Sequence, residues 1–220
     1  MDAKRAAAEA AALLVEDGMI VGLGSGTTAA IAVQAIGRRA PRIVAVATSE
    51  KTAELARSFG IRLATLAEQP RLDLTIDGAD EVELGTLNLV KGRGGALLRE
   101  KIVASATARL VIVADEGKVV ERLSAVERPI PVEVVPFGWE STAARLRALG
   151  ANPILREGYV TDGGHYILDC LWADMGDAAS LAARLDGVVG AVEHGLFIGM
   201  TAEAIVGNDS GGTRVLRRER

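Results

Sequence analysis

Short apolar runs alternate with helix-forming segments through the first half of this chain of 220 residues, and this alternation restricts its fold more than any other feature. The runs are apolar almost throughout, as expected of strands that are buried on both faces. Because strands separated by helices form parallel sheets, we predict an α/β fold, a Rossmann-like parallel sheet flanked by helices. The predicted strands are 19–23, 43–47, 72–76, 87–90 and 110–114, and the predicted helices are 2–17, 28–39, 50–59 and 95–107.

The alternation stops at three prolines, Pro129, Pro131 and Pro136. Beyond them, helical and strand-like patterns are mixed, which favours a second, smaller α+β domain. The last apolar segments, 196–200 and 204–206, are expected to return to the first sheet. The elements predicted in the small domain are a helix at 140–149 and strands at 166–171 and 188–192. The predicted domains are residues 1–127 plus 198–220 for the α/β domain and residues 128–197 for the small one.

Composition restricts the partners of the chain. A net charge of −4 gives no general attraction to nucleic acid or to anionic membranes, so we expect a small-molecule ligand, no nucleic acid and no membrane.

The single cysteine, Cys170, lies in a largely apolar run and is predicted to be a buried structural thiol. Residues 2–17 lack the apolar core of a signal peptide, and no apolar stretch has transmembrane length, so we expect a cytoplasmic protein.

A glycine-rich loop at 22–28 joins a predicted strand to a predicted helix. Backbone amides at such a helix start bind anions, so this loop is a candidate phosphate site. It is neither a dinucleotide fingerprint, because Thr27 stands where that pattern needs glycine, nor a Walker loop, because the lysine is missing. The alternative is that the glycines serve only a tight turn.

Three carboxylates follow the predicted strand 72–76, in the segment 77–81. Like charges and partial burial raise the pKa of at least one such group, which makes proton transfer possible. The alternative is an acidic turn, with or without a bound cation. We predict no metal site, because the two histidines, His165 and His194, are far apart and show no ligand spacing. Both are interpreted as structural.

The third candidate motif is a lysine followed by glycines, at 91–95. The predicted helix 95–107 then carries Glu100 and Lys101. Taken alone, a Glu-Lys pair on a helix indicates a solvated face. Together, the loops offer an anion cradle, carboxylates and a lysine, without an activated serine or cysteine. This combination favours proton shuttling on a phosphorylated substrate.

The same motifs resemble those of the type A ribose-5-phosphate isomerases. The resemblance rests on Val-Gly-Leu-Gly-Ser-Gly-Thr-Thr at 21–28, Asp-Gly-Ala-Asp-Glu at 77–81 and Lys-Gly-Arg-Gly-Gly-Ala-Leu-Leu-Arg-Glu-Lys at 91–101. It extends along nearly the whole chain, through 48–52, 131–136, 160–162 and 193–197. One departure is Arg93, where that family usually has glycine.

The resemblance implies an aldose-ketose isomerase that interconverts D-ribose 5-phosphate and D-ribulose 5-phosphate without a cofactor, as a homodimer or a dimer of dimers. It implies that Glu100 moves a proton between C2 and C1, that Asp77 and Asp80 bind hydroxyls and assist ring opening, and that Lys91 stabilises the enediolate. The other residues that it places at the substrate are Ser25, Gly26, Thr27, Thr28, Gly78, Ala79, Gly92, Arg93, Gly94, Lys118 and Lys4.

Two other function classes stay open at this point. One is another enzyme of the same broad fold, such as an amino-sugar-phosphate deaminase or a coenzyme A transferase, since a fold does not determine a reaction. The other is a sugar-phosphate sensor without catalysis. Such a sensor is expected to lack the base and to carry a DNA-binding element, whereas Glu100 is present and no basic helix-turn-helix segment is apparent.

Overall fold

A computed structural model describes residues 2–124 and 128–218 of the chain. Its largest sheet contains seven strands in the order β15-β14-β7-β4-β1-β2-β3. The described pairs are parallel, except that β15 runs antiparallel to β14 at one edge. The strands are β1 (Ile20–Leu23), β2 (Val44–Ala47), β3 (Arg62–Leu63), β4 (Leu74–Gly78), β7 (Leu110–Asp115), β14 (Thr201–Gly207) and β15 (Thr213–Arg217).

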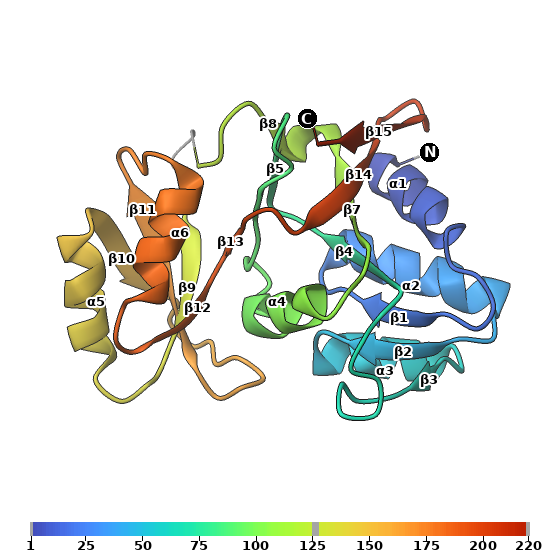
Figure 1. Cartoon of the computed structure of the whole chain (residues 1–220), viewed down its shortest axis with the longest axis horizontal. Coiled ribbons are helices and arrows are strands. Elements are labelled where there is room, and N and C mark those ends of the chain that lie inside the picture. Colours follow the sequence, from blue (N-terminus) through green and yellow to red (C-terminus); the bar gives the residue numbers. More distant parts are fainter. Residues whose placement is uncertain (1, 125–127, 219–220) are drawn as a thin grey trace.

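Helices cover both faces of this sheet (Figure 1). On one face, α1 (Ala3–Ala12), α2 (Thr27–Arg39) and α3 (Glu50–Ser58) lie side by side, and α4 (Leu97–Ser105) lies on the other. Along β7 the buried side chains alternate: Val111 and Val113 pack in the core with α1 and α2, whereas Ile112 packs in a separate core on the opposite face. Burial on both faces explains the continuous apolar runs in the sequence.

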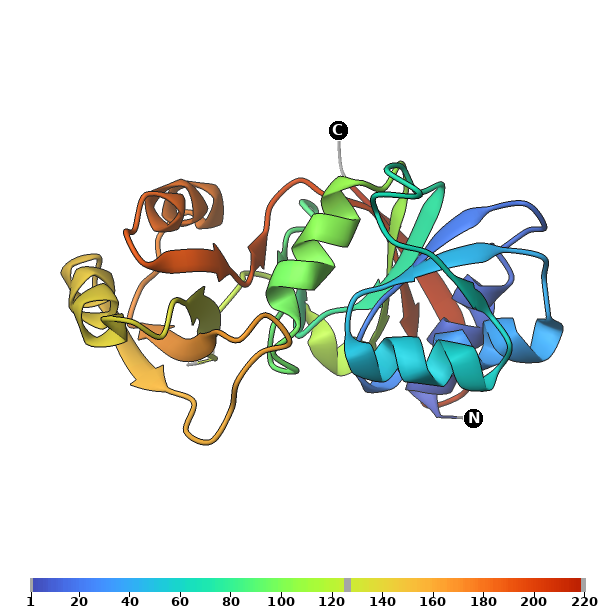
Figure 2. The same cartoon turned by 90° about the horizontal axis from the view of Figure 1, so that it is seen from below.

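A smaller α+β part stands beside this layer, with α4 between the two (Figure 2). Its antiparallel sheet has the order β10-β11-β9-β12 and carries two helices. A third, short sheet has the order β13-β6-β5-β8. The remaining elements are β5 (Glu81–Glu83), β6 (Leu89–Val90), the 3₁₀ turn Glu116–Lys118, β8 (Val119–Val120), β9 (Ile130–Val134), α5 (Trp139–Ala148), β10 (Ala151–Leu155), β11 (Tyr166–Trp172), α6 (Ala178–Asp186), β12 (Ala191–His194) and β13 (Leu196–Phe197).

The predicted fold class is therefore confirmed, and most predicted strands agree with the structure within a few residues. The predicted return of the chain is also confirmed for 204–206, since β14 pairs with β7 inside the large sheet. The predicted domain boundary between residues 127 and 128 falls on a segment, 125–127, that lies outside the described residues. The division into two domains at that point stays a prediction.

The first predicted helix is too long. Asp2 caps it as expected, by accepting a hydrogen bond from the Lys4 amide, but the helix ends at Ala12 instead of continuing to residue 17. Beyond it, the amides of Leu14 and Val15 bond only three residues back, in tighter turns. The side chain of Arg39, from α2, donates to the carbonyl oxygens of Ala12 and Val15. Tertiary contacts thus replace the last helical turn.

The strand predicted at 87–90 is shorter, Leu89–Val90, and pairs antiparallel with β5 and β13 in the third sheet instead of joining the large parallel sheet. Further errors lie in the second half. The strand predicted at 188–192 starts too early, because residues 188–190 form a turn and β12 begins at Ala191. Helix α6 was not predicted, although Asp177 caps it as a typical N-cap residue. Pro131 does not break the structure but is the second residue of β9, where it lies before the register with β12 begins. The segment 196–200 contributes β13 to the short third sheet and not to the large one.

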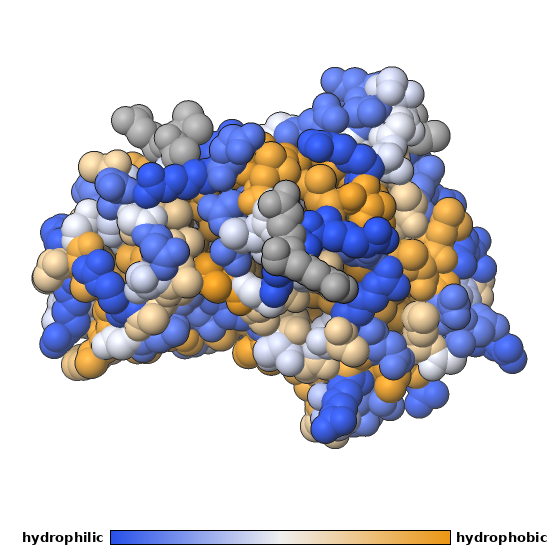
Figure 3. Space-filling model, turned by 45° about the horizontal axis from the view of Figure 1, so that its top comes forward, coloured by the Kyte–Doolittle hydropathy of each residue, from blue (hydrophilic) through white to orange (hydrophobic). Residues whose placement is uncertain are grey.

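The surface is mixed in character. Figure 3 shows one face on which apolar areas are interspersed with hydrophilic side chains, as is normal for globular proteins. Among residues 2–124 and 128–218, no helix combines the length and hydrophobicity that a membrane crossing requires.

Cys170 is fully buried in the core of the small sheet, which confirms its prediction as a buried thiol.

Gly207 in β14 lies directly against the backbone of α1. A Cβ at this position would overlap the backbone carbonyl of Ala3 and press on the Ala7 amide. We expect Gly207→Ala to lower the free energy of unfolding by about 1–3 kcal/mol, the usual cost of overpacking. Denaturant titration measures this value. The control is Gly187→Ala, whose Cβ meets its nearest atom at 3.6 Å and whose φ of −86° suits alanine. Equal stability of the two variants would contradict the packing argument.

Candidate active site

The three motifs come together at the carboxyl ends of three strands. The glycine loop begins at the end of β1 and the acidic segment at the end of β4, both in the large sheet, and the lysine-glycine loop follows β6 of the short third sheet. They enclose a narrow cleft of about 120 Å³. The residues that line it are Lys4, Ser25, Gly26, Thr27, Thr28, Gly78, Ala79, Asp80, Lys91, Gly92, Gly94, Glu100 and Lys118. All of them belong to the predicted set.

The glycine loop is shaped as an anion cradle. Gly26 adopts φ 96°, which only glycine tolerates readily, and it immediately precedes the first turn of α2. No side chain caps this helix end, and the helix dipole favours negative charge there. Lys4 from α1 and Lys118 from the turn after β7 line the same cleft, so positive charge surrounds its outer part.

Hydroxyl groups hold the side chain of Ser25 in place. Its Oγ lies 2.8 Å from Thr48 Oγ1, 2.8 Å from Ser49 Oγ and 3.1 Å from Thr52 Oγ1. Thr52 also donates to the carbonyl of Gly24 at 3.1 Å. No role was predicted for these three residues, although Thr48 and Ser49 directly follow the end of β2, which was the available signal.

Asp77 lies beneath the cleft instead of lining it. Its side chain is almost fully buried, and Oδ1 accepts the amides of Ser25 at 3.1 Å and Gly78 at 2.7 Å. Gly24 allows this approach, because a Cβ there would overlap the Asp77 carboxylate and its Cα. Asp77 therefore connects the glycine loop to the acidic segment.

Lys91 is the buried centre of the site. Its Nζ lies 3.1 Å from Asp77 Oδ2 and 3.2 Å from Glu100 Oε1, and it donates to the Gly78 carbonyl at 2.5 Å. Burial disfavours the ammonium charge, but Asp77 and Glu100 outweigh this effect and hold the pKa of Lys91 above its usual value. The side chain is thus a fixed cation with only 3% of its surface exposed.

Glu100 does not lie on a solvated helix face, so that alternative is wrong. Its side chain points from α4 into the cleft, with 5% of its surface exposed. Burial raises the pKa of Glu100 to about 8, with Asp77 and Asp80 adding to the effect and Lys91 opposing it. Burial raises the pKa of Asp77 as well, against the pull of Lys91. The cluster therefore holds a carboxyl group that can take up and release a proton near neutral pH.

Arg93 is the one predicted site residue that neither lines the cleft nor contacts the buried cluster. It is exposed, and its backbone makes the contacts: the amide donates to Asp80 Oδ2 at 3.0 Å, and the carbonyl accepts from Arg156 Nη1 at 3.1 Å. The first of these bonds fixes Asp80 at the cleft edge. The carbonyls of the same loop accept bonds from the small sheet: Arg156 Nη1 reaches Gly92 at 3.2 Å, and the Tyr159 hydroxyl reaches Gly94 at 3.0 Å. Neither contact could be predicted from the sequence, because both depend on the packing of distant segments.

The two histidines have structural partners. His165 Nδ1 lies 2.9 Å from Glu133 Oε1, and His194 Nε2 lies 3.1 Å from Asp186 Oδ1. One possible ligand cluster exists in the described part of the chain, formed by Asp186, Glu193 and His194. The ammonium of Lys101 already lies at this cluster, 2.6 Å from Glu193 Oε1, and supplies the positive charge there.

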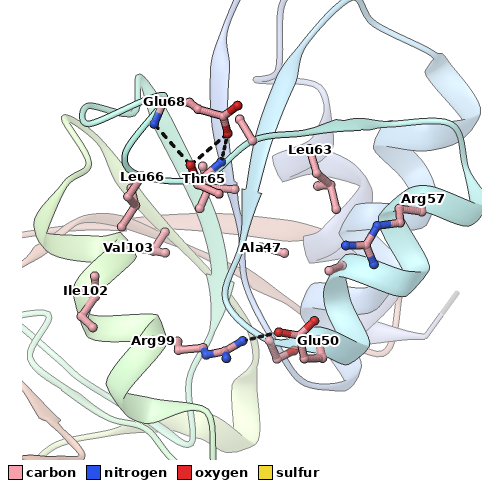
Figure 4. Close-up of a pocket in the computed structure, with 14 residues that line it drawn as sticks. Ala47, Glu50, Arg57, Leu63, Thr65, Leu66, Glu68, Arg99, Ile102 and Val103 are labelled. Carbon is pink, nitrogen blue, oxygen red and sulfur yellow. Dashed lines mark hydrogen bonds and ion pairs between the residues drawn. The ribbon is translucent and has the colours of Figure 1, made fainter. Parts of the chain in front are cut away.

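A larger hollow of about 470 Å³ lies between α4 and α3 (Figure 4). None of the predicted site residues lines it. Its polar side chains bond with one another: Arg99 reaches Glu50 at 2.9 Å, and Glu68 accepts from Thr65. The carboxyl and ammonium groups suited to proton transfer lie in the narrow cleft instead.

Comparisons with known proteins identify relatives along nearly the whole chain. A family model described as ribose 5-phosphate isomerase A (phosphoriboisomerase A) matches residues 44–211. A ribose-5-phosphate isomerase A from Synechococcus sp. (strain JA-3-3Ab) is 57% identical over 217 residues, which cover 94% of this chain and 94% of the relative. One from Gloeobacter violaceus is 54% identical and covers 97% of this chain and 95% of its own length.

Solved structures show the same fold. A ribose 5-phosphate isomerase A from Methanocaldococcus jannaschii superposes with a TM-score of 0.93 at 35% identity and covers 98% of both chains. A D-ribose-5-phosphate isomerase in complex with phospho-erythronic acid superposes with a TM-score of 0.94 at 33% identity, covering 99% of this chain and 100% of its own.

The raised pKa of Glu100 predicts a distinctive pH dependence of stability. The pKa of Glu100 rises from the ordinary 4.5 of a glutamate to about 8, so the folded state holds an extra proton between these two pH values. By linkage, the contribution of this group to the free energy of unfolding is largest at low pH and is lost as the pH rises through that window. We expect Glu100→Gln to remove this slope, so the stability difference between variant and wild type should shift in favour of the variant with rising pH.

Denaturant titrations at several pH values between about 5 and 9 measure the difference. The control is Glu54→Gln, an exposed carboxylate on α3. A difference between Glu100→Gln and wild type that stays constant over this range would show that Glu100 ionises normally.

Proposed function

The chain belongs to the ribose 5-phosphate isomerase A family, and we propose that Glu100 and Lys91 carry its interconversion of D-ribose 5-phosphate and D-ribulose 5-phosphate. The reaction is an aldose-ketose isomerisation of the non-oxidative pentose phosphate pathway. The observation that carries the assignment of residues is the buried contact of Lys91 Nζ with Glu100 Oε1, 3.2 Å apart, at the wall of a cleft.

The outer part of the cleft suits the phosphate group. The start of α2, with Ser25, Gly26, Thr27 and Thr28, offers backbone and hydroxyl donors. We assign Lys4 and Lys118 to the same group as cations. The sugar then extends inward, past Gly78, Ala79 and Asp80, toward Glu100 and Lys91.

In the open-chain sugar, Glu100 removes the proton from C2, and the electron pair of that C–H bond forms the C1–C2 double bond of an enediolate. The former aldehyde oxygen O1 gains negative charge, which Lys91 stabilises as a preorganised cation in a buried site. Glu100 returns its proton to C1, while the O2 proton moves to O1. We assign ring opening and this oxygen-to-oxygen transfer to Asp80, which lines the cleft.

Asp77 takes a supporting part in this scheme. Because it lies beneath the cleft and contacts Lys91 Nζ at 3.1 Å, we assign it to keeping Lys91 charged and oriented. This assignment modifies the direct contact with sugar hydroxyls that the resemblance implied. No step of the scheme uses a cofactor or a metal ion.

We also propose that the enzyme works in the cytoplasm as a homodimer or a dimer of dimers. Support for the compartment comes from the substrate of the family, a phosphorylated metabolite, and support for the assembly comes from the family resemblance. Sedimentation equilibrium of the purified protein distinguishes monomer, dimer and tetramer.

The first test concerns Glu100. Glu100→Gln keeps size and hydrogen bonding but removes the base, and we expect turnover of ribose 5-phosphate to fall about 10²–10⁴-fold. Exchange of the C2 hydrogen with deuterated solvent should fall in parallel, because both processes need the same proton abstraction. Glu54→Gln should be unaffected in both assays. Normal exchange in Glu100→Gln would transfer the role of base to Asp77 or Asp80.

The second test concerns Lys91. Negative charge on O1 develops mainly in the transition state, so we expect Lys91→Ala to lower kcat much more than it raises KM. The variant also leaves the buried carboxylates without their cation, which should cost about 3–5 kcal/mol of stability. Lys51→Ala, an exposed lysine on α3, is the matched control. An unchanged kcat with a raised KM would assign Lys91 to ground-state binding.

A further inference from the structure

Three consecutive charged side chains of α4, at residues 99–101, point in three directions. Arg99 contacts Glu50 and Asp162, Glu100 points into the cleft toward Lys91, and Lys101 reaches β12 of the small sheet. Consecutive residues of an α-helix are about 100° apart around its axis, so a rotation that moves one of them moves its neighbours too. The contacts of Lys101 therefore bear directly on the position of Glu100.

Lys101 is held by an extensive set of contacts. Its Nζ lies 2.6 Å from Glu193 Oε1, donates to the His194 carbonyl at 2.7 Å, and lies 5.0 Å from the centre of the Phe197 ring. Only 15% of the Lys101 side chain and 21% of the Glu193 side chain are exposed. Such partly buried contacts are less screened by water than a surface ion pair.

His194 completes the surroundings of Lys101 without adding charge. Its Nδ1 accepts the Leu196 amide at 3.2 Å, so the proton of the neutral ring lies on Nε2 and points to Asp186. Burial and the neighbouring Lys101 lower the pKa of His194, which keeps the ring neutral. The charged groups that face Lys101 are thus Glu193 and, beyond the ring, Asp186.

The segment Glu193–Phe197, which contains these partners of Lys101, also contacts Lys91. The Lys91 amide donates to the Gly195 carbonyl at 2.8 Å, and β13 pairs with β6, the strand that Lys91 follows. Lys91 Nζ lies 5.5 Å from the ring centre of Phe197, the ring that Lys101 also contacts. A side chain at Gly195 would overlap the Lys91 carbonyl, so the two segments are packed as closely as glycine permits.

We propose that Lys101 is a positioning residue, whose ion pair with Glu193 fixes the rotation of α4 and so sets the separation between Glu100 and Lys91. The segment Glu193–Phe197 acts as the common support: it binds the Lys91 strand through its backbone and the Glu100 helix through Glu193. Lys101 touches no substrate, since it does not line the cleft. The inference rests on the proposed function of Glu100 and Lys91, but the placement of α4 can be measured without turnover.

Geometry explains why this contact matters for rate. A misplacement of about 1 Å at a reacting group can cost on the order of 10²-fold in rate. Loss of the Lys101 contacts would allow α4 to shift relative to Lys91, whose ammonium lowers the pKa of Glu100 against the effect of burial. A shifted helix therefore changes both the rate of proton abstraction and the pH at which Glu100 ionises. Glu100 is also faced by Asp77 and Asp80, which these variants leave unchanged.

The experiment compares Lys101→Met, which keeps the length of the side chain and removes its charge, with Glu193→Gln and the double variant. We expect kcat for ribose 5-phosphate to fall about 10- to 100-fold in each single variant, with KM changed less than about 3-fold. The double variant should be no slower than the worse single one, because both substitutions break the same pair. Lys101→Arg should recover part of the loss.

A second measurement does not depend on activity. The pH-dependent stability difference caused by Glu100→Gln is measured in the wild-type and in the Lys101→Met backgrounds. We expect this stability difference to reach half of its total change at a different pH, here called the midpoint, in the Lys101→Met background. The reason is that Glu100 then lies at another distance from Lys91. Lys51→Met, on exposed α3, is the control for removing a lysine and should change neither kcat nor the midpoint.

The outcomes separate the two hypotheses. An inactive wild-type protein would refute the proposed function, and the stability midpoints would still test the role of Lys101. Wild-type kcat and an unchanged midpoint in Lys101→Met would overturn the proposal. A lower melting temperature with unchanged kcat and midpoint would also overturn it, by reducing Lys101 to a purely structural contact.

Discussion

The site depends on one buried cation between two buried carboxylates. Lys91 lies within 3.2 Å of both Asp77 and Glu100 and is shielded from water. Removing Lys91 would leave buried carboxylates without a compensating charge, which is far more costly than a broken surface pair. Burial raises the pKa of Glu100 to about 8 against the pull of Lys91, so one member of the cluster can exchange a proton near neutral pH.

The architecture brings these three residues together from separate strands and a helix. Asp77 is the penultimate residue of β4, Lys91 follows β6, and Glu100 points inward from α4. Close backbone approach is needed at two points, Gly24 beside Asp77 and Gly195 beside Lys91, where any side chain would overlap. The glycines of this region thus serve packing around the cluster as much as the binding of phosphate.

The small sheet acts on the site through its edges. Arg156 and Tyr159 bond to the carbonyls of the glycine loop after Lys91, and Glu193 binds Lys101 on the helix of Glu100. Both walls of the cleft are therefore tied to the same neighbouring layer. A rigid support of this kind limits the motion of groups whose separation controls proton transfer.

The α/β class follows from the sequence, because strands buried on both faces must be apolar throughout. The residues that line the cleft were predicted from three motifs near strand ends together with the family resemblance, which added Lys4 and Lys118. The sequence could not determine which way Glu100 points, since a Glu-Lys pair on a helix is by itself typical of solvent. Nor could it find the end of α1, where Arg39 bonds the last carbonyls, or the pairing of Lys101 with Glu193, which lie 92 positions apart. Those features depend on contacts between distant segments, and only the packing of the folded chain decides them.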